Sequence, residues 1–65
     1  MKYIEFIDFF TKKFVLMRKD VIQVVEDESK PEEKLTKVKI ILDDGSIEYT
    51  STPYKLIREE LLADV

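Results

Sequence analysis

Asp44-Gly45 lies between two runs in which apolar and polar residues alternate, and Gly45 is the only glycine among the 65 residues. Asp-Gly between such runs is the strongest short-range signal of a β-hairpin, because a two-residue type I′ loop needs positive φ at both positions. We therefore predict a hairpin over residues 35–51. A two-residue loop would pair Leu42 with Ile47, and directly opposed residues share a face. This register predicts an apolar face made of Val38, Ile40, Leu42, Ile47 and Tyr49.

A C-terminal helix is predicted from Pro53 to Ala63. Thr52 can cap the first backbone N–H groups, and proline suits the first helical position because its missing N–H needs no partner there. Leu56 falls opposite the apolar stripe of this helix, where it could contribute to a partner surface. The stripe itself consists of Tyr54, Ile57, Leu61 and Val65, with Leu62 at its edge.

The first part of the chain has the composition of several strands. Residues 3–10 fit a helix by the spacing of their apolar residues, and they also fit a strand that is buried on both faces. Their aromatic and β-branched content favours the strand, and residues 11–13 would turn into a second strand at 14–17. A further turn at residues 18–20 would lead into a third strand over 20–26.

Residues 26–34 contain no apolar side chain and one proline, so we predict a mobile, solvated acidic loop there. Together these segments predict a single domain over residues 1–65. The predicted fold class is α+β, mainly β. It is a small SH3-like barrel or a curved antiparallel sheet of four or five strands, with one C-terminal helix.

Histidine and cysteine are both absent from the chain. Disulfides, zinc sites built on these residues, and Cys or His nucleophile machinery are therefore excluded. Carboxyl groups cluster at Asp44, but a solvated turn does not shift a pKa far enough for acid–base catalysis. We expect no enzymatic activity, no metal and no cofactor. No apolar run approaches the roughly 20 residues of a membrane span, so we expect a cytoplasmic protein without a membrane partner.

Three tyrosines and four phenylalanines are a large aromatic content for one small domain. A barrel of this size cannot easily bury all the aromatic residues of its N-terminal segment, so some of them should face a partner. Burial across a symmetric dimer would accommodate them. The predicted partner-binding residues are Phe6, Phe9, Phe10, Phe14 and Leu56.

Basic residues flank these aromatic residues, although the whole chain carries eleven bases against fourteen acids and a net charge of −3. The negative net charge disfavours binding to a phosphate backbone. Bases beside exposed aromatic rings can nevertheless form a platform for a nucleic-acid strand. The candidate nucleic-acid contacts are Lys12, Lys13, Arg18 and Lys19.

The run Phe14-Val15-Leu16, the segments 20–26 and 38–49, and the closing segment 52–61 are similar to the small bacterial flagellar FlbD-like proteins. The resemblance implies the same order of strands, a glycine hairpin and a terminal helix. Residues 40–61 also resemble the last part of a LytTR-type DNA-binding domain, in which an Asp-Gly hairpin leads to a helix.

The sequence thus leads us to expect a non-enzymatic protein-interaction module of bacterial or phage origin, acting by self-association or by docking on a larger protein. The alternative is a small nucleic-acid-binding regulatory protein. The first hypothesis places the contacts on exposed side chains of the N-terminal strands or on the outer face of the helix, and the alternative places them on the basic residues beside the N-terminal aromatic residues.

Overall fold

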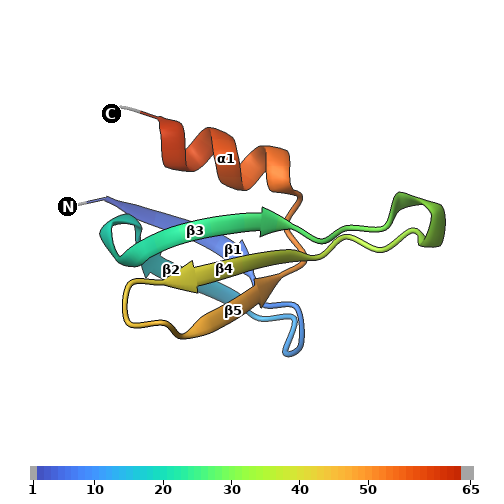
Figure 1. Ribbon diagram of the computed structural model, residues 1–65, viewed down its shortest axis with the longest axis horizontal. Coiled ribbons are helices and arrows are strands. Elements are labelled where there is room, and N and C mark those ends of the chain that lie inside the picture. The colour runs from blue at the N-terminus through green and yellow to red at the C-terminus, as the bar shows by residue number, and fades with distance from the viewer. Residues whose placement is uncertain (1, 64–65) are drawn as a thin grey trace.

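Strands account for most of the regular structure in the computed structural model, which describes residues 2–63 (Figure 1). The strands are β1 (Tyr3–Ile7), β2 (Phe14–Arg18), β3 (Ile22–Asp27), β4 (Val38–Leu42) and β5 (Ile47–Thr50). The helices are the α-helix α1 (Tyr54–Leu62) and two short 3-10 helices, η1 (Lys19–Val21) and η2 (Pro31–Glu33). These elements confirm the predicted α+β, mainly β class with a C-terminal helix.

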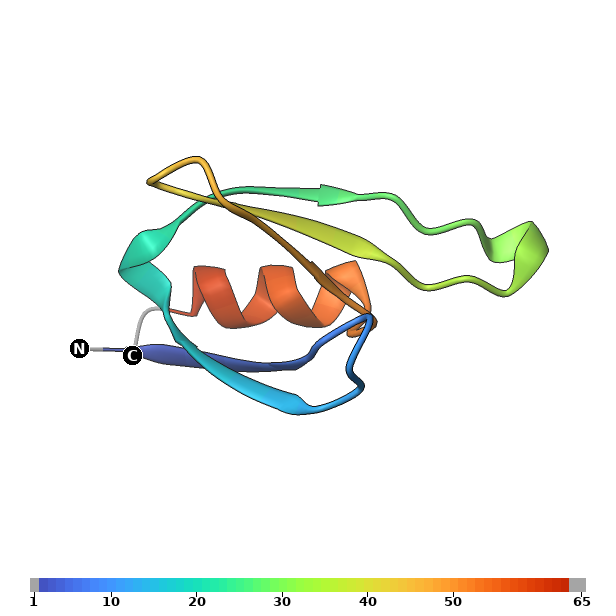
Figure 2. The same cartoon turned by 90° about the horizontal axis from the view of Figure 1, so that it is seen from below.

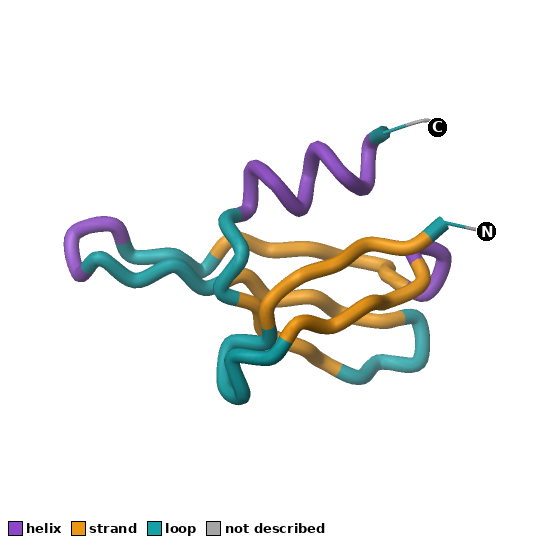
Figure 3. The backbone as a smooth tube through the Cα atoms, turned by 180° about the vertical axis from the view of Figure 1, so that it is seen from behind, coloured by secondary structure: helices purple, strands orange, loops and turns teal. Residues whose placement is uncertain are grey.

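The five described strands form two antiparallel sheets, β1-β2 and β3-β4-β5. An isolated bridge between Asp8 and Thr50 links them, and Phe9 N donates a hydrogen bond to Tyr49 O over 2.9 Å. In the view from behind, the β1–β2 hairpin lies in front of the other sheet (Figure 3). This arrangement shows two linked sheets, whereas closure into an SH3-like barrel stays a prediction.

The core lies between the two sheets and α1. Its buried cluster consists of Ile4, Phe6, Ile40 and Ile57, each at most 1% exposed. Figure 2 shows α1 running along the space between β3–β4 and β1–β2, so that the helix covers one open side of the pair of sheets. Full burial of each such side chain stabilises the fold by about 1.5–3 kcal/mol.

The turn between β4 and β5 differs from the predicted two-residue loop. Gly45 N donates to Leu42 O over 3.0 Å, and Leu42 N donates to Ser46 O over 2.9 Å. Three residues therefore form the loop, and of them only Gly45 has positive φ, at 88°. This is the pattern of a type I turn followed by a left-handed glycine, which needs one positive φ instead of two. The prediction of a two-residue type I′ loop was wrong.

The extra loop residue moves β5 by one position along β4. Ile41 pairs with Ile47 and Val38 with Thr50, so the predicted pairing of Leu42 with Ile47 does not occur. Because strand side chains alternate with a period of two, this shift moves every side chain of β5 to the face opposite the predicted one. Val38 and Ile40 face the core as predicted, but Ile47 and Tyr49 point to the outer face, and Thr50 is completely buried instead.

Buried Thr50 keeps its hydroxyl satisfied through β1. Its Oγ1 donates a hydrogen bond to Ile7 O over 2.6 Å and accepts one from Thr52 N over 3.0 Å. Thr52 Oγ1 in turn accepts a hydrogen bond from Ile7 N over 3.1 Å. The predicted cap of the helix by Thr52 was therefore wrong, because this hydroxyl joins the two sheets, and Pro53 stands at the N-cap without a side-chain cap.

The N-terminal segment is a strand, as predicted, and the helical alternative is excluded. Only one face of β1 is buried: Ile4 and Phe6 point inward, whereas Tyr3 is 49% exposed. The expectation of burial on both faces was wrong, because nothing among the described residues covers the outer side of the β1–β2 sheet. The strands predicted over 14–17 and 20–26 correspond to β2 and β3.

The helix α1 follows the predicted stripe in its described part. Ile57 is buried, Tyr54 and Leu61 are half-buried, and Leu56 is exposed on the other side. Val65, the predicted last member of the stripe, lies outside the described residues.

The acidic segment 26–34 continues the β3–β4 hairpin as an arm that projects from the rest of the fold (Figure 1). Lys30 and Leu35 form an isolated bridge, and Ser29 Oγ accepts a hydrogen bond from Lys37 N over 3.0 Å. Nearly all of its side chains are exposed, in agreement with the predicted solvation. The arm is thus a hydrogen-bonded hairpin extension, and its mobility stays a prediction.

Candidate interaction surfaces

The outer face of the β1–β2 sheet has large apolar side chains that are exposed on both of its strands. Phe14 is 74% exposed, Leu16 65% and Tyr3 49%. These residues share one face because the pairing sets Tyr3 opposite Arg18 and Glu5 opposite Leu16. We call this surface the outer β1–β2 face; it consists of Tyr3, Glu5, Ile7, Phe14, Leu16 and Arg18.

The backbone of β2 presents its hydrogen-bonding groups on the side away from β1. The bonds from Asp8 N to Lys13 O and from Lys19 N to Lys2 O, both 2.9 Å, fix which residue pairs exchange hydrogen bonds. Hydrogen-bonded pairs alternate along an antiparallel ladder, so the intervening β2 residues direct their N–H and C=O outward. These residues are Phe14, Leu16 and Arg18, which also carry the exposed side chains. Among residues 2–63, β2 pairs with β1 alone.

Arg18 lies at the end of this face in a local ion pair. Its Nη2 is 2.6 Å from Asp20 Oδ2, and its Nε donates to Asp20 Oδ1 over 3.1 Å. The hydrogen bond with Asp20 raises the pKa of Arg18 and lowers the pKa of Asp20. Both side chains are about half exposed, so the pair contributes little stability and can rearrange when a partner approaches.

A second surface, the aromatic–lysine cluster, consists of Phe9, Phe10, Lys12, Lys37 and Tyr49. The Phe10 ring lies edge-on to both other rings, with centroids 5.1 Å from Phe9 and 5.9 Å from Tyr49. Lys12 Nζ is 4.6 Å from the Phe9 centroid, and Lys37 Nζ is 4.5 Å from the Tyr49 centroid. Such cation–π contacts at an exposed site contribute about 0.5–1 kcal/mol each.

The turn between β1 and β2 holds this cluster in place. Asp8 Oδ2 accepts hydrogen bonds from Thr11 N over 2.8 Å and from Phe10 N over 3.0 Å. The N–H of Thr11 contributes most to lowering the pKa of Asp8 below its ordinary value of 3.8. Lys12 adopts φ of 62°, a left-handed conformation that strains most side chains. This turn holds Phe9 and Phe10 beside Tyr49. Tyr49 lies on this surface because the β5 register is shifted by one residue.

The predicted partner-binding residues lie in four different places. Phe6 is 1% exposed in the core, so the prediction for this residue was wrong: it points to the inner side of β1, where Ile57 packs. Phe14 lies on the outer β1–β2 face, and Phe9 and Phe10 lie in the aromatic–lysine cluster. Leu56 lies on α1, beside a cavity of about 240 Å³ that is also lined by Glu59, Glu60 and Glu5, the last a residue of the outer β1–β2 face.

The predicted basic residues are not one platform. Lys12 and Lys13 lie in the turn before β2, whereas Arg18 is the last residue of β2 and Lys19 follows it. A five-residue strand separates the two pairs by about 17 Å, from a rise of about 3.4 Å per residue. Lys37 joins Lys12 over the rings instead. It was not among the four candidate contacts, because pairing between segments that are distant in the chain brings it there.

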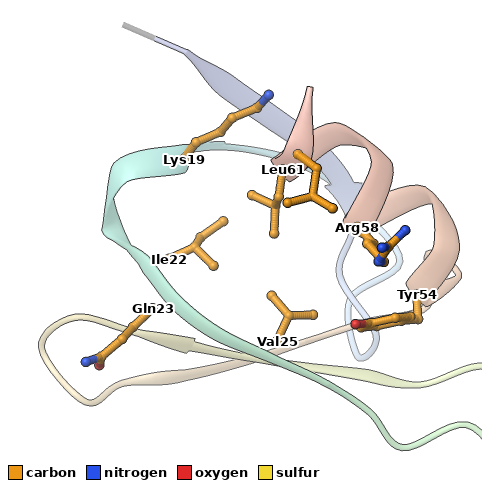
Figure 4. A pocket seen from close by; sticks show the side chains of 8 residues that line it. Lys19, Ile22, Gln23, Val25, Tyr54, Arg58 and Leu61 are labelled. Atoms are coloured by element: carbon orange, nitrogen blue, oxygen red, sulfur yellow. The ribbon is translucent and has the colours of Figure 1, made fainter. Parts of the chain in front are cut away.

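A third feature, the β3–α1 pocket, has a volume of about 400 Å³ and lies between these two elements (Figure 4). Sequence reasoning did not indicate it. Its lining residues are Lys19, Ile22, Gln23, Val25, Tyr54, Arg58, Leu61 and Leu62.

Comparison of the chain with protein-family models, with curated proteins and with solved structures finds no match. The resemblances to FlbD-like proteins and to the LytTR domain therefore stay predictions. Over residues 2–63, no helix has the length and apolar character needed to cross a membrane, and no group of three or more acidic side chains is arranged to hold a metal ion.

Proposed function

We propose that this protein is a non-enzymatic interaction module that associates with a second copy of itself through β2. The single observation that carries the proposal is the coincidence, in Phe14, Leu16 and Arg18, of outward backbone groups with exposed side chains. An edge strand with large apolar side chains is a ready template for pairing with another chain.

The sequence of β2 is self-complementary when two copies pair antiparallel. With Leu16 on the two-fold axis, Leu16 lies opposite its own counterpart, and Phe14 of each copy lies opposite Arg18 of the other. All three are residues whose N–H and C=O point to the open edge, so each pair would exchange two backbone hydrogen bonds. The result is a four-stranded sheet with an isologous interface, the commonest symmetry of protein dimers.

The side chains fit this register as well as the backbone does. Leu16 meets Leu16 in an apolar contact, and the Arg18 guanidinium can stack on the Phe14 ring of the other copy, a favourable cation–π geometry. Within these three pairs no like charges are directly opposed; like charges so placed would destabilise a cross-strand pair. Shifting the centre by one residue would bring inward-pointing Val15 or Met17 onto the axis and turn their hydrogen-bonding groups away from the edge.

This interface is small, because only three residue pairs per dimer make the ladder. It falls below the roughly 800 Å² per partner of a standard stable interface. We therefore expect reversible association with a dissociation constant on the order of micromolar or weaker. Such an equilibrium allows the same edge to exchange its second copy for a strand of a larger protein.

The experiment is sedimentation velocity across a concentration series with wild type, Leu16→Lys and Leu56→Lys. Leu16→Lys opposes two ammonium groups on the axis, so we expect a monomer at every concentration that gives a wild-type dimer. Leu56→Lys is the matched control, because Leu56 is also exposed, at 51%, but lies on α1. It should associate like the wild type.

A wild-type chain that stays monomeric throughout the series would overturn self-association. Equal loss of the dimer in both variants would place the interface elsewhere and also overturn the proposal. Far-ultraviolet circular dichroism of each variant checks that the fold is retained. Because position 16 is exposed and its inward neighbours are unchanged, both variants should give the wild-type spectrum.

The aromatic–lysine cluster supports a second candidate, binding of single-stranded nucleic acid. Phe10 is 69% exposed, and two lysines lie over the adjacent rings, so bases could stack on Phe10 while phosphates contact the ammonium groups. Fluorescence anisotropy with a labelled oligonucleotide in increasing salt tests it. A steep loss of binding with salt that is absent in Lys37→Gln supports this candidate, and no binding at low salt removes it.

A further inference from the structure

We infer that the β3–α1 pocket binds a small amphipathic carboxylate, a molecule with an apolar chain and one anionic head. Its volume of about 400 Å³ lies within the usual range for small-molecule sites. Figure 4 shows Ile22, Val25 and Leu61 pointing into its centre, with Lys19 and Arg58 on opposite sides of Leu61 in this view. This inference does not depend on self-association, because none of the pocket residues belongs to β2.

An irregularity in β3 creates the apolar floor. Ile22 pairs with Leu42, but Val24 pairs with Ile41, so the register shifts between these β3 residues. A bulge of this kind adds one residue to a strand and changes the facing of its side chains. Ile22 and Val25 are consequently both half-buried toward the pocket, although a regular strand would place residues three apart on opposite faces. Bulges are over-represented beside binding sites.

The helix supplies the opposite wall through one of its faces. Tyr54, Arg58, Leu61 and Leu62 follow the spacing of four, three and one residues that places side chains together on a helix. Leu61 is half-buried and packs against the core cluster. The Tyr54 ring lies near Val25 in Figure 4, which closes one end of the cavity with an aromatic surface.

Among residues 2–63, two positively charged side chains and no acidic side chain line the pocket. Lys19 is half-buried, and its Nζ donates a hydrogen bond to the backbone O of Glu60 in the last turns of α1. That bond fixes the ammonium group at the rim and leaves its other two N–H groups available to a ligand. Arg58 forms no ion pair with any acidic group of residues 2–63. Its guanidinium can therefore bind a carboxylate by two parallel hydrogen bonds.

The combination decides the ligand class. An apolar floor favours an aliphatic or aromatic tail, and the two cations of the lining favour an anionic head. A purely polar anion would leave the floor in contact with water, and a cationic amphiphile would meet repulsion from Lys19 and Arg58. Only an amphipathic anion satisfies both halves of the lining.

The experiment is a titration of the isotope-labelled protein with octanoate, followed by the amide resonances of β3 and α1. Acetate, which has the head without the tail, and octylammonium, which has the tail with the opposite charge, are the probe controls. We expect saturable shifts confined to the pocket with octanoate and none with either control. Unsaturated shifts spread over the surface, or equal shifts with octylammonium, would overturn the inference.

Arg58→Gln and Lys55→Gln form the matched pair of variants. Each removes one positive charge from an exposed position on α1, but only Arg58 lines the pocket. We expect Arg58→Gln to weaken octanoate binding about tenfold, as for the loss of a charge-assisted hydrogen bond, and Lys55→Gln to leave it unchanged. Equal weakening by both would mean general attraction to the protein's surface and would contradict a built site. Neither variant touches Leu16, so a failure here leaves the sedimentation result intact.

Discussion

Two of the edge strands, β2 and β3, differ in what lies along their unpaired edges. β3 contains a bulge, ends in the acidic residues Glu26 and Asp27, and has α1 beside it across the pocket. β2 is regular and presents Phe14 and Leu16, which are among the most exposed apolar residues described.

Natural sheets avoid unwanted pairing by bulges, charged side chains and covering elements at their edges. β3 shows all three features, so its edge is protected. The middle of β2 shows none of them, and its only charge is Arg18 at the end, where the proposed register gives it a partner ring. This difference supports β2, with the outer β1–β2 face beside it, as the edge at which we propose that another chain pairs.

The largest expected effect is on stability, and it should differ between the inner and the outer face of the β1–β2 sheet. Phe6→Ala removes a side chain that is 1% exposed, so we expect a loss of about 3–5 kcal/mol in the free energy of unfolding. Phe14→Ala makes the same chemical change at a side chain that is 74% exposed, and the loss in the monomer should be within about 0.5 kcal/mol. Urea denaturation at low protein concentration measures both. Similar losses would mean that the outer face is packed, which would remove the contrast between the edges.

A smaller effect tests the register of the β2 pair. Phe14 lies opposite Arg18 of the second copy, so Phe14→Lys opposes like charges twice per dimer, whereas Phe14→Glu opposes unlike charges. We expect Phe14→Lys to raise the dissociation constant about tenfold and Phe14→Glu to change it by less than about threefold. Sedimentation equilibrium of the two variants measures the difference. If both variants weaken the dimer equally, the proposed register is wrong even though β2 pairs.

The smallest effect concerns the turns, one in each sheet. Hydrogen bonds from Thr11 lower the pKa of Asp8, and those from Ser46 lower the pKa of Asp44, both from an ordinary value of 3.8. A carboxyl whose pKa is lower in the folded protein stabilises it above the unfolded value, and this contribution is lost as pH falls through the folded value. We therefore expect stability to be insensitive to these groups above pH 3.8 and to decline below it.

Thermal unfolding over a pH series measures this decline. Asp8→Asn should make this decline less steep because it removes the carboxylate of the β1–β2 turn, and Asp44→Asn should do the same in the β4–β5 turn. An acid decline as steep in the double variant as in the wild type would show that other carboxyl groups control it. A larger effect of Asp8→Asn than of Asp44→Asn would indicate that the β1–β2 turn, beside the unpaired edge of β2, depends more on its carboxylate than the β4–β5 turn does.

Local patterns predicted the elements well because each depends on neighbouring residues. The aromatic and β-branched content of residues 3–7 gave β1, and the apolar stripe around Ile57 gave α1. The β5 register failed for a different reason. Asp-Gly is compatible with loops of two or three residues, and Thr50, not the aromatic Tyr49, occupies the buried position. A hydroxyl is acceptable there because it bonds to Ile7 O of the other sheet, a contact between residues 43 positions apart.

The candidate surfaces were predicted only in part. Exposed Phe10 and Phe14 were anticipated from the excess of aromatic residues, and exposed Leu56 from its position opposite the helix stripe. Phe6 could not be distinguished from the other phenylalanines, because the side of the strand on which it lies was not known. Lys37 joined the rings of Phe9 and Tyr49 through pairing between distant strands, which composition does not record.

By itself the sequence determined the kind and order of elements: strands, a glycine turn, an acidic arm and a closing helix, since propensity and periodicity act over a few residues. The tertiary structure alone decided which face of each strand became the core, that Thr52 links the sheets instead of capping α1, and that a pocket remains beside β3. The physical reason is that a one-residue difference in a loop inverts the facing of every side chain in the strand that follows, and only the packing of distant segments selects between the two outcomes.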